Sequence, residues 1–263
     1  MKSILIIGKK SFIGSNLKNY LKKFYRVDCL TFEDVIKKDI LFFENFSHVI
    51  NTSIHKNYIN ERYRLINDLD RKFILKFKKI NFIYIFLNTR KIYLPNSNIT
   101  ENSIKKPSCL YSKNKLKTEQ FLKKQIKSKL LSLRIGNIIG KKIFKNQRNN
   151  HRLFFDNYLI LRKRNEKIFI DNDFKDFLSI IQFCRIVRDL VKNNVIGIYN
   201  VSISKKIFLS EILYWLDKKF YKKIKFTNYS SDSFSLNNKK LLKRIVKRPL
   251  KSELKNFCEK ILS

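Results

Sequence analysis

The fold is decided by the stretch Ile4-Leu5-Ile6-Ile7-Gly8-Lys9-Lys10-Ser11-Phe12-Ile13-Gly14-Ser15-Asn16-Leu17 near the start of the chain. Four aliphatic residues predict a buried strand, and apolar residues from Ile13 onward recur at helical spacing. Between them lies a GxxSxxG turn, which can present backbone N–H groups and a helix dipole to a pyrophosphate. Taken alone, this segment fits a dinucleotide site and an ordinary strand-to-helix turn equally well.

The first half of the chain continues the same alternation. Short β-branched or aromatic runs predict strands at Ser3–Ile7, Arg26–Thr31, Val49–Thr52, Phe82–Asn88 and Leu130–Ile135. Helical spacing predicts helices at Ile13–Phe24, about Tyr58–Lys78 and about Tyr111–Lys127. This pattern is typical of βαβ units, so we predict a Rossmann-like, doubly wound parallel sheet of the α/β class. Its nucleotide site should lie at the carboxyl ends of the strands, near the topological switch point.

The alternation weakens after Gly140, where the polar stretch Lys145–Asn150 predicts a loop or domain crossing before a helix from about Leu153. Further strands are predicted at Lys167–Ile170, Ile198–Val201 and Lys223–Phe226, and helices at Leu209–Phe220 and Leu250–Leu262. We therefore predict a dinucleotide-binding domain over residues 1–140, with a returning segment near 176–202. Residues 141–263 should form mostly a small α+β substrate-binding lid portion.

Composition narrows the class of protein. A chain of 263 residues with 44% hydrophobic content can bury a core. Its four cysteines are widely spaced without a CxxC pair or a histidine cluster, which predicts neither a disulfide framework nor a metal site. The N-terminal apolar run ends at Lys9, too short for a signal peptide or membrane span. We expect a cytoplasmic protein without membrane insertion.

The net charge of +37 raises the hypothesis of an electrostatic nucleic-acid binder. The lysines are spread along the whole chain, however, and no zinc-finger spacing, RNA-binding aromatic motif or basic leucine-zipper pattern is present. We therefore expect no specific nucleic-acid binding. Part of the charge remains available for the phosphates of a metabolite.

The opening turn resembles that of the extended short-chain dehydrogenase/reductases, the NAD-dependent epimerase/dehydratase family, where it reads like TGxxGFIG. Gly8, Phe12, Ile13 and Gly14 match, and Ser11 departs. The resemblance continues at Asp39, which that family places against adenine, and at Val49–Ser53, a strand end beside the cofactor. It implies an NAD(P) cofactor bound by Gly8, Lys10, Ser11, Phe12, Ile13, Gly14, Thr31, Asp39, Thr52, Ser53, Tyr111 and Lys115.

The choice between NAD and NADP depends on the end of the second predicted strand, where an acidic residue would hold the ribose hydroxyls and repel a 2′-phosphate. Thr31 occupies that position, and Lys10 with its neighbour in the turn could pair with a 2′-phosphate. These residues favour NADP. Glu33 and Asp34 are close enough in sequence to take the ribose role, so NAD stays open.

Tyr111-Ser112-Lys113-Asn114-Lys115 has the spacing YxxxK, which places Tyr111 and Lys115 on one helical face. Spacing alone carries little weight in a chain so rich in lysine. Its position in the resemblance implies that Tyr111 exchanges a proton with a sugar hydroxyl, while Lys115 lowers the pKa of Tyr111 and holds the nicotinamide ribose. Thr89, four residues before Tyr93, is implied as the hydroxyl that orients the reacting oxygen.

The reaction is narrowed by the two residues after Thr89. Sugar-nucleotide 4,6-dehydratases of this family carry an Asp-Glu pair there, whereas this chain has Arg90 and Lys91. The resemblance therefore implies a nucleotide-sugar epimerase or 4-keto reductase rather than a dehydratase. A catalytically weak NAD(P)-binding sensor or scaffold of the same fold is the alternative.

On the substrate side, Leu133–Gly140 is similar to the family's LRxxNxxG loop, which implies that Asn137 faces the nucleotide sugar. Lys175–Leu178 is similar to its Arg-Asp-Phe-Ile segment, with Lys175 at the phosphate-binding arginine. The arginine-bearing diphosphate motif near the end is missing. Relatives also imply a homodimer formed through the helix that carries Tyr111.

Overall fold

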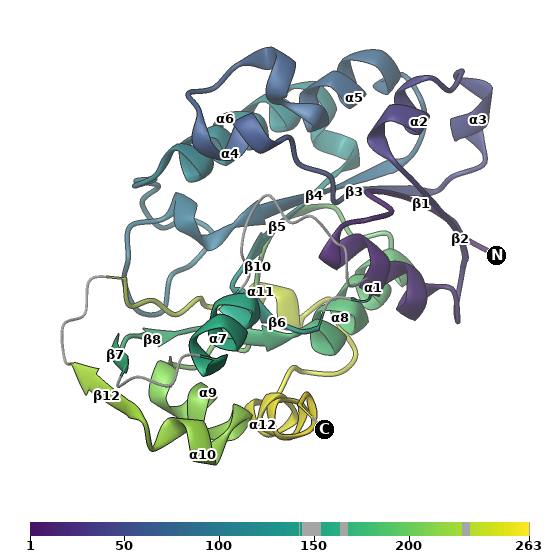
Figure 1. Ribbon diagram of the computed structural model, residues 1–263. Coiled ribbons are helices and arrows are strands. Elements are labelled where there is room, and N and C mark those ends of the chain that lie inside the picture. Colours follow the sequence, from purple (N-terminus) through teal and green to yellow (C-terminus); the bar gives the residue numbers. More distant parts are fainter. Residues whose placement is uncertain (142, 144–153, 164–167, 228–231, 263) are drawn as a thin grey trace.

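A six-stranded parallel sheet forms the centre of the molecule in this computed structural model, which describes residues 1–141, 143, 154–163, 168–227 and 232–262 (Figure 1). The strands are β1 (Ser3–Ile7), β2 (Arg26–Leu30), β3 (His48–Asn51), β4 (Ile83–Thr89), β5 (Leu130–Ile135) and β10 (Gly197–Val201). Their order, β10-β5-β4-β3-β1-β2, reverses direction between β1 and β3. The Rossmann-like, doubly wound fold predicted from the sequence is confirmed.

Helices cover both faces of this sheet (Figure 1). One face carries α1 (Phe12–Leu21) and α8 (Ile180–Lys192); the other carries α2 (Phe32–Ile36), α3 (Leu41–Glu44), α4 (Lys56–Asn60), α5 (Leu69–Phe77) and α6 (Leu110–Ile126). Successive residues of β1 serve the two faces alternately: Ile4 and Ile6 pack into one core cluster, Leu5 and Ile7 into the other. A strand buried on both faces reads as a continuous apolar run, which explains the opening of the sequence.

A small α+β portion follows β5. It contains the strand pairs β6 (Asn137–Ile139) with β9 (Phe177–Ser179), β7 (Ile168–Asp171) with β12 (Ile224–Thr227), and β8 (Phe174–Lys175) with β11 (Ile207–Phe208). Its helices are α7 (Phe154–Lys163), α9 (Leu209–Leu216), α10 (Lys218–Tyr221), α11 (Lys239–Leu242) and α12 (Lys251–Lys260). The chain returns to the central sheet through α8 and β10. The predicted loop at 145–150 and the predicted element starts at Leu153 and Lys167 lie outside the described residues.

Two helices predicted as continuous are interrupted by aspartates. The segment predicted as one helix over about Tyr58–Lys78 comprises the end of α4, a short 3₁₀ turn and α5, because Asp68 is the N-cap of α5 and accepts from the backbone N–H of Arg71 at 2.9 Å. The segment predicted over Leu209–Phe220 divides at Asp217, which caps α10 in the same way. Aspartate favours the extended backbone of an N-cap over a helix interior, and helical periodicity alone does not reveal such a break.

A buried ion pair joins α6 to the sheet. Glu119 and Arg134 approach to 2.6 Å between Oε2 and Nη2, with side chains only 4% and 2% exposed. The Glu119 carboxylate also accepts hydrogen bonds from Asn88 on β4 and Ser132 on β5. Burial alone would raise the pKa of Glu119, but these donors and the guanidinium charge hold it below its usual value.

We predict that Glu119→Gln lowers the free energy of unfolding by about 3 kcal/mol, because it leaves the buried Arg134 charge without a counter-ion. Chemical denaturation monitored by circular dichroism measures the change. The control is Glu259→Gln, which removes an exposed pair with Lys255 on α12 and should change stability by less than about 0.5 kcal/mol. Equal effects of the two substitutions would contradict a special role for the Glu119–Arg134 pair.

Candidate active site

A cleft of about 590 Å³ opens where the strand order reverses. Its walls come from the loops that follow β1, β2 and β3, and from the start of α6. The lining residues are Gly8, Lys9, Lys10, Ser11, Phe12, Ile13, Thr31, Phe32, Glu33, Asn51, Thr52, Ser53, Ile54, His55, Lys56, Ile59, Leu69, Leu87, Tyr111 and Lys115. The cleft thus brings together ten of the predicted cofactor-binding residues, including the pair Tyr111 and Lys115.

The turn after β1 is too tight for side chains at its two glycines. Gly8 has φ +117°, and a Cβ there would lie 2.3 Å from Thr52 Oγ1. A Cβ on Gly14 would lie 2.5 Å from the backbone oxygen of Gly8. Gly14 is not among the residues that line the cleft. Its lack of a side chain lets α1 pack close behind the turn. The two glycines shape a concave backbone surface of the kind that accepts phosphate groups.

Ser11, which departs from the family's glycine, has a structural task in this turn. It is the N-cap of α1: its Oγ accepts from the backbone N–H of Gly14 at 2.8 Å and lies 2.6 Å from Thr52 Oγ1. Thr52 in turn donates to the backbone oxygen of Ile7. The serine is small enough for this turn. It caps the start of α1 and contacts Thr52, the residue that follows β3.

Charged residues of both signs line the cleft beside the loops that follow β1 and β2. Lys9 and Lys10 line it, and so does Glu33. Asp34 is engaged elsewhere, because Thr31 caps α2 and donates to the Asp34 carboxylate at 2.7 Å. Of the two acidic residues predicted as candidates for a ribose contact, Glu33 lines the cleft and Asp34 is not among its lining residues.

Asp39, which the resemblance implies as an adenine contact, lies just before the start of α3. It is exposed, and its carboxylate accepts from the backbone N–H of Phe42 at 2.9 Å. Asp39 is not among the residues that line the cleft. Its carboxylate binds the first turn of a helix, a contact that the linear sequence does not reveal.

Tyr111 and Lys115 lie one helical turn apart at the start of α6 and both face the cleft. Burial, followed by the negative charge of Asp70, raises the pKa of Tyr111. The side chain of Lys115 is only 7% exposed, and its Nζ lies 3.9 Å from Asp70 Oδ2. Burial lowers the pKa of Lys115, and the Asp70 carboxylate opposes that shift. Without a bound ligand, the site therefore holds Tyr111 as a phenol.

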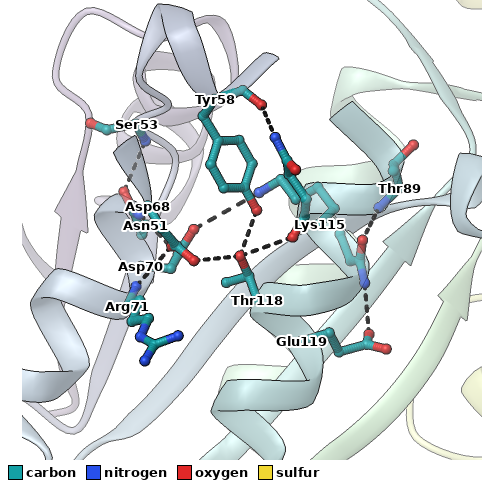
Figure 2. Close-up of polar contacts among 12 residues, drawn as sticks. Asn51, Ser53, Tyr58, Asp68, Asp70, Arg71, Thr89, Lys115, Thr118 and Glu119 are labelled. Atoms are coloured by element: carbon teal, nitrogen blue, oxygen red, sulfur yellow. Dashed lines mark hydrogen bonds and ion pairs between the residues drawn. The ribbon is translucent and has the colours of Figure 1, made fainter. Parts of the chain in front are cut away.

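A cluster of buried acids lies behind Lys115 (Figure 2). Asp70 accepts hydrogen bonds on Oδ1 from Asn51 at 2.9 Å and from the Tyr84 hydroxyl at 2.7 Å. Asp68 accepts from the Thr118 hydroxyl at 2.6 Å. The sequence interpretation did not include these residues. The signal that could have revealed them is the Asn-Asp-Leu-Asp run at 67–70 beside the apolar residues of a helix, since acidic side chains are almost never fully buried without a partner.

Thr89 ends β4, where its Oγ1 accepts from the backbone N–H of Lys91 at 3.3 Å, and it is not among the lining residues. The next residue, Arg90, is buried and holds Asp232 by two hydrogen bonds of 2.6 Å while stacking on Phe234. Burial alone would raise the pKa of Asp232, but the Arg90 guanidinium above all lowers it to about 2.

The two predicted substrate residues lie in the α+β portion, away from the lining of this cleft. Asn137 begins β6, and its backbone N–H donates to the Asp176 carbonyl at 2.9 Å. Lys175 lies on β8, with its ammonium 3.0 Å from Asp232 and 3.6 Å from Asp173. Lys175 and Arg90 therefore share one carboxylate, which joins the end of β4 to the α+β portion.

Across the described residues, no group of three or more histidine, cysteine or acidic side chains is placed to hold a metal ion. Within the same residues, no helix is both long and apolar enough to span a membrane.

No family model and no curated protein matches the sequence. Solved structures do. UDP-N-acetylglucosamine 4-epimerase from Methanobrevibacter ruminantium M1, in complex with UDP-N-acetylmuramic acid, is 16% identical with a TM-score of 0.78 over 99% of this chain and 97% of that one. The dTDP-glucose 4,6-dehydratase from Bacillus anthracis, in complex with NAD, is 14% identical with a TM-score of 0.76 over 100% of this chain and 96% of that one. A dTDP-4-dehydrorhamnose reductase from Clostridium acetobutylicum is 16% identical with a TM-score of 0.74 over 99% of this chain and 100% of that one.

At these identities the likeness establishes the fold. The whole chain, including its α+β portion, has the architecture that the resemblance to extended short-chain dehydrogenase/reductases implied.

We predict that Gly14→Ala destabilises the protein by about 1–3 kcal/mol, since the new methyl group meets the Gly8 carbonyl within a packed turn. Alanine ordinarily stabilises a helix relative to glycine, so the sign of the effect is diagnostic. Urea denaturation measures it. The control is Asn19→Ala on the exposed side of the same helix, which should leave stability unchanged or slightly higher. A stabilised Gly14→Ala variant would show that the turn is not closed as described.

Proposed function

We propose that this protein is an NAD(P)-dependent enzyme that acts on a nucleotide-linked sugar, as an epimerase or a keto-sugar reductase. The observation that carries the proposal is the meeting of the Gly8–Gly14 turn and the pair Tyr111 and Lys115 in one cleft at the switch point. In α/β sheets of this kind, nucleotide ligands bind at that position. The structures that match include a sugar-nucleotide epimerase and a reductase, which supports the same class of reaction.

The cleft fits a dinucleotide on a structural test. A Cβ at Gly8 would lie 2.3 Å from Thr52 Oγ1, so only glycine lets the turn keep this conformation, in which its backbone N–H groups can approach a pyrophosphate. Gly8, Ser11 and Ile13 would hold the pyrophosphate, and Thr52 and Ser53 would face the remainder of the cofactor. When bound, the nicotinamide supplies hydride transfer. We propose NADP as the preferred form, because two lysines, Lys9 and Lys10, line the cleft against the single carboxylate of Glu33.

Tyr111 is proposed to exchange the proton that accompanies hydride transfer. Since burial and Asp70 raise its pKa, the phenol is the dominant form near neutrality, ready to donate its proton to a sugar carbonyl. Proton removal from a sugar hydroxyl needs added positive charge nearby, which Lys115 supplies in part. Thr89 is proposed to orient the reacting oxygen once a substrate competes with its backbone contact.

We further propose that the enzyme does not dehydrate its substrate. Arg90 and Lys91 follow Thr89 and carry no carboxyl group, so neither position offers a carboxyl acid/base pair, and Arg90 holds Asp232 by two hydrogen bonds. Asn137 and Lys175 are proposed to face the sugar nucleotide from the α+β portion. Lys175 would then exchange its contact with Asp232 for a phosphate oxygen.

A catalytically weak NAD(P)-binding sensor or scaffold is the second candidate. Two observations favour it: Ser11 already caps the Gly14 N–H group, and Lys175 already has two carboxylate partners. Both contacts would have to be given up or shared when a cofactor and a substrate bind.

We expect NADPH to raise the melting temperature more than NADH at equal concentration, because a ligand selective for the native state stabilises it. Differential scanning fluorimetry measures both shifts. Lys10→Glu should reverse the order by placing a carboxylate near the 2′-position, whereas Lys124→Glu on the outer surface of α6 should preserve it. Absence of a shift with either nucleotide would remove the cofactor assignment.

Tyr111→Phe is expected to lower turnover by about 10²–10⁴-fold, since it removes the proton-transfer group. The assay follows nicotinamide absorbance with a panel of UDP- and dTDP-linked hexoses and 4-keto-hexoses. The thermal shift with NADPH should persist, because the ring still fills its place. Undiminished turnover in this variant would contradict the catalytic role, and binding without turnover of any panel member in the wild type would favour the sensor.

A further inference from the structure

The ammonium group of Lys115 has an unusual partner. Lys115 lies on α6 and Asp70 on α5, and both side chains are almost fully buried. Nζ lies 3.9 Å from Asp70 Oδ2, and no other carboxylate of the described residues lies within 4.0 Å of it. The ammonium otherwise faces the ring of Phe86 at 4.5 Å and that of Tyr58 at 5.7 Å. Aromatic faces attract a cation, but they do not compensate a full buried charge.

Asp70 is itself held in place from the sheet. Its Oδ1 accepts from Asn51 at the end of β3 and from the Tyr84 hydroxyl on β4, which leaves Oδ2 directed at Lys115. Asn51 Oδ1 accepts from the backbone N–H of Ser53, a residue of the cleft wall. Figure 2 shows this chain of contacts running from Ser53 through Asn51 and Asp70 to Lys115.

We infer that Asp70 is a positioning residue for Lys115: its carboxylate fixes the ammonium group on the cleft wall and keeps it charged. The inference rests on the proposed function for its purpose, because a charged Lys115 is what a nicotinamide ribose and the Tyr111 phenolate require. Its physical basis is independent of that function. A lysine buried without a counter-ion gives up its proton readily, and one paired with a carboxylate retains it.

The charged and titratable groups around the pair are few. Asp68 belongs to the same helix, but its carboxylate is taken up by Tyr63, Thr118 and the start of α5. The other titratable neighbours of the pair are phenols: Tyr58 of α4, Tyr84 of β4 and Tyr111 of α6. Burial raises the pKa of each of them, so they add no charge near neutrality. Among the residues that the structure describes, Asp70 and Asp68 are thus the acids that act on Lys115, and Asp70 has the larger effect.

The protonation of Lys115 can be measured without substrate or cofactor. Trace acetic anhydride acetylates only unprotonated amines, so labelling across a pH series, quantified by peptide mass spectrometry, gives the titration curve of each lysine. We expect Asp70→Asn to move the Lys115 curve toward lower pH by about one unit, a roughly tenfold rise in labelling at fixed pH. Lys10, exposed on the same cleft, should be unchanged.

Asp68→Asn is the matched control, since it removes an equally buried carboxylate two residues away and retains an N-cap residue. It should move the Lys115 curve by less than half as much. Circular dichroism and melting temperature establish that each variant is folded. Should Asp70→Asn not fold, Tyr84→Phe removes one hydrogen bond that favours the Asp70 carboxylate and should move the curve the same way by a smaller amount. An unchanged Lys115 curve, or an equal shift in Asp68→Asn, overturns the inference.

A second arm separates this inference from the proposed function. Excess NADPH or NADH should protect wild-type Lys115 from acetylation if the cofactor occupies the cleft. Protection without a shift in Asp70→Asn overturns the role of Asp70 and leaves the cofactor site standing. A shift without protection upholds the role of Asp70 and contradicts the cofactor site.

Discussion

The buried pair between Glu119 and Arg134 fixes the rotation of α6, and the candidate site depends on that rotation. Tyr111, Lys115 and Glu119 are spaced by four residues, so they share one face of the helix. Because Glu119 binds groups on both β4 and β5, the helix cannot turn about its axis without exposing a buried charge. The same contact that anchors the helix therefore aims Tyr111 and Lys115 at the cleft. One face of α6 therefore carries first the two residues that line the cleft and then the residue of the stabilising ion pair.

The turn after β1 shows a different balance between stability and binding. Two glycines keep the backbone close to β3, while Ser11 caps α1 and contacts Thr52. The cap makes the turn more rigid than a glycine would. It also takes up the Gly14 N–H group, one of the donors that a phosphate at a helix start would use. Rigidity is gained at the cost of one potential ligand contact.

Acidic residues have a distinct place in this cationic chain. Of its 21 acids, six are buried in the described part: Asp68, Asp70, Glu119, Asp173, Asp176 and Asp189. They neutralise buried cations, cap helices or bind backbone N–H groups, as Asp176 does at the start of the loop after β10. The surface is consequently even more positive than the net charge suggests. Six of the 21 carboxylates therefore have structural partners in the interior, which leaves few carboxylates to offset the positive charge of the surface lysines.

The sequence by itself determined the sheet-and-helix alternation, the glycine turn and the shared face of Tyr111 and Lys115. These depend on local periodicity and on backbone freedom at a few positions, which neighbouring residues specify. Tertiary structure alone decided that Asp70 meets Lys115, that Arg90 pairs with Asp232 142 residues away, and that the Asp39 carboxylate binds the start of α3. Such contacts follow from the order of strands in the sheet and from competition among polar groups for partners. The periodicity of a single sequence reveals neither the strand order nor the outcome of this competition.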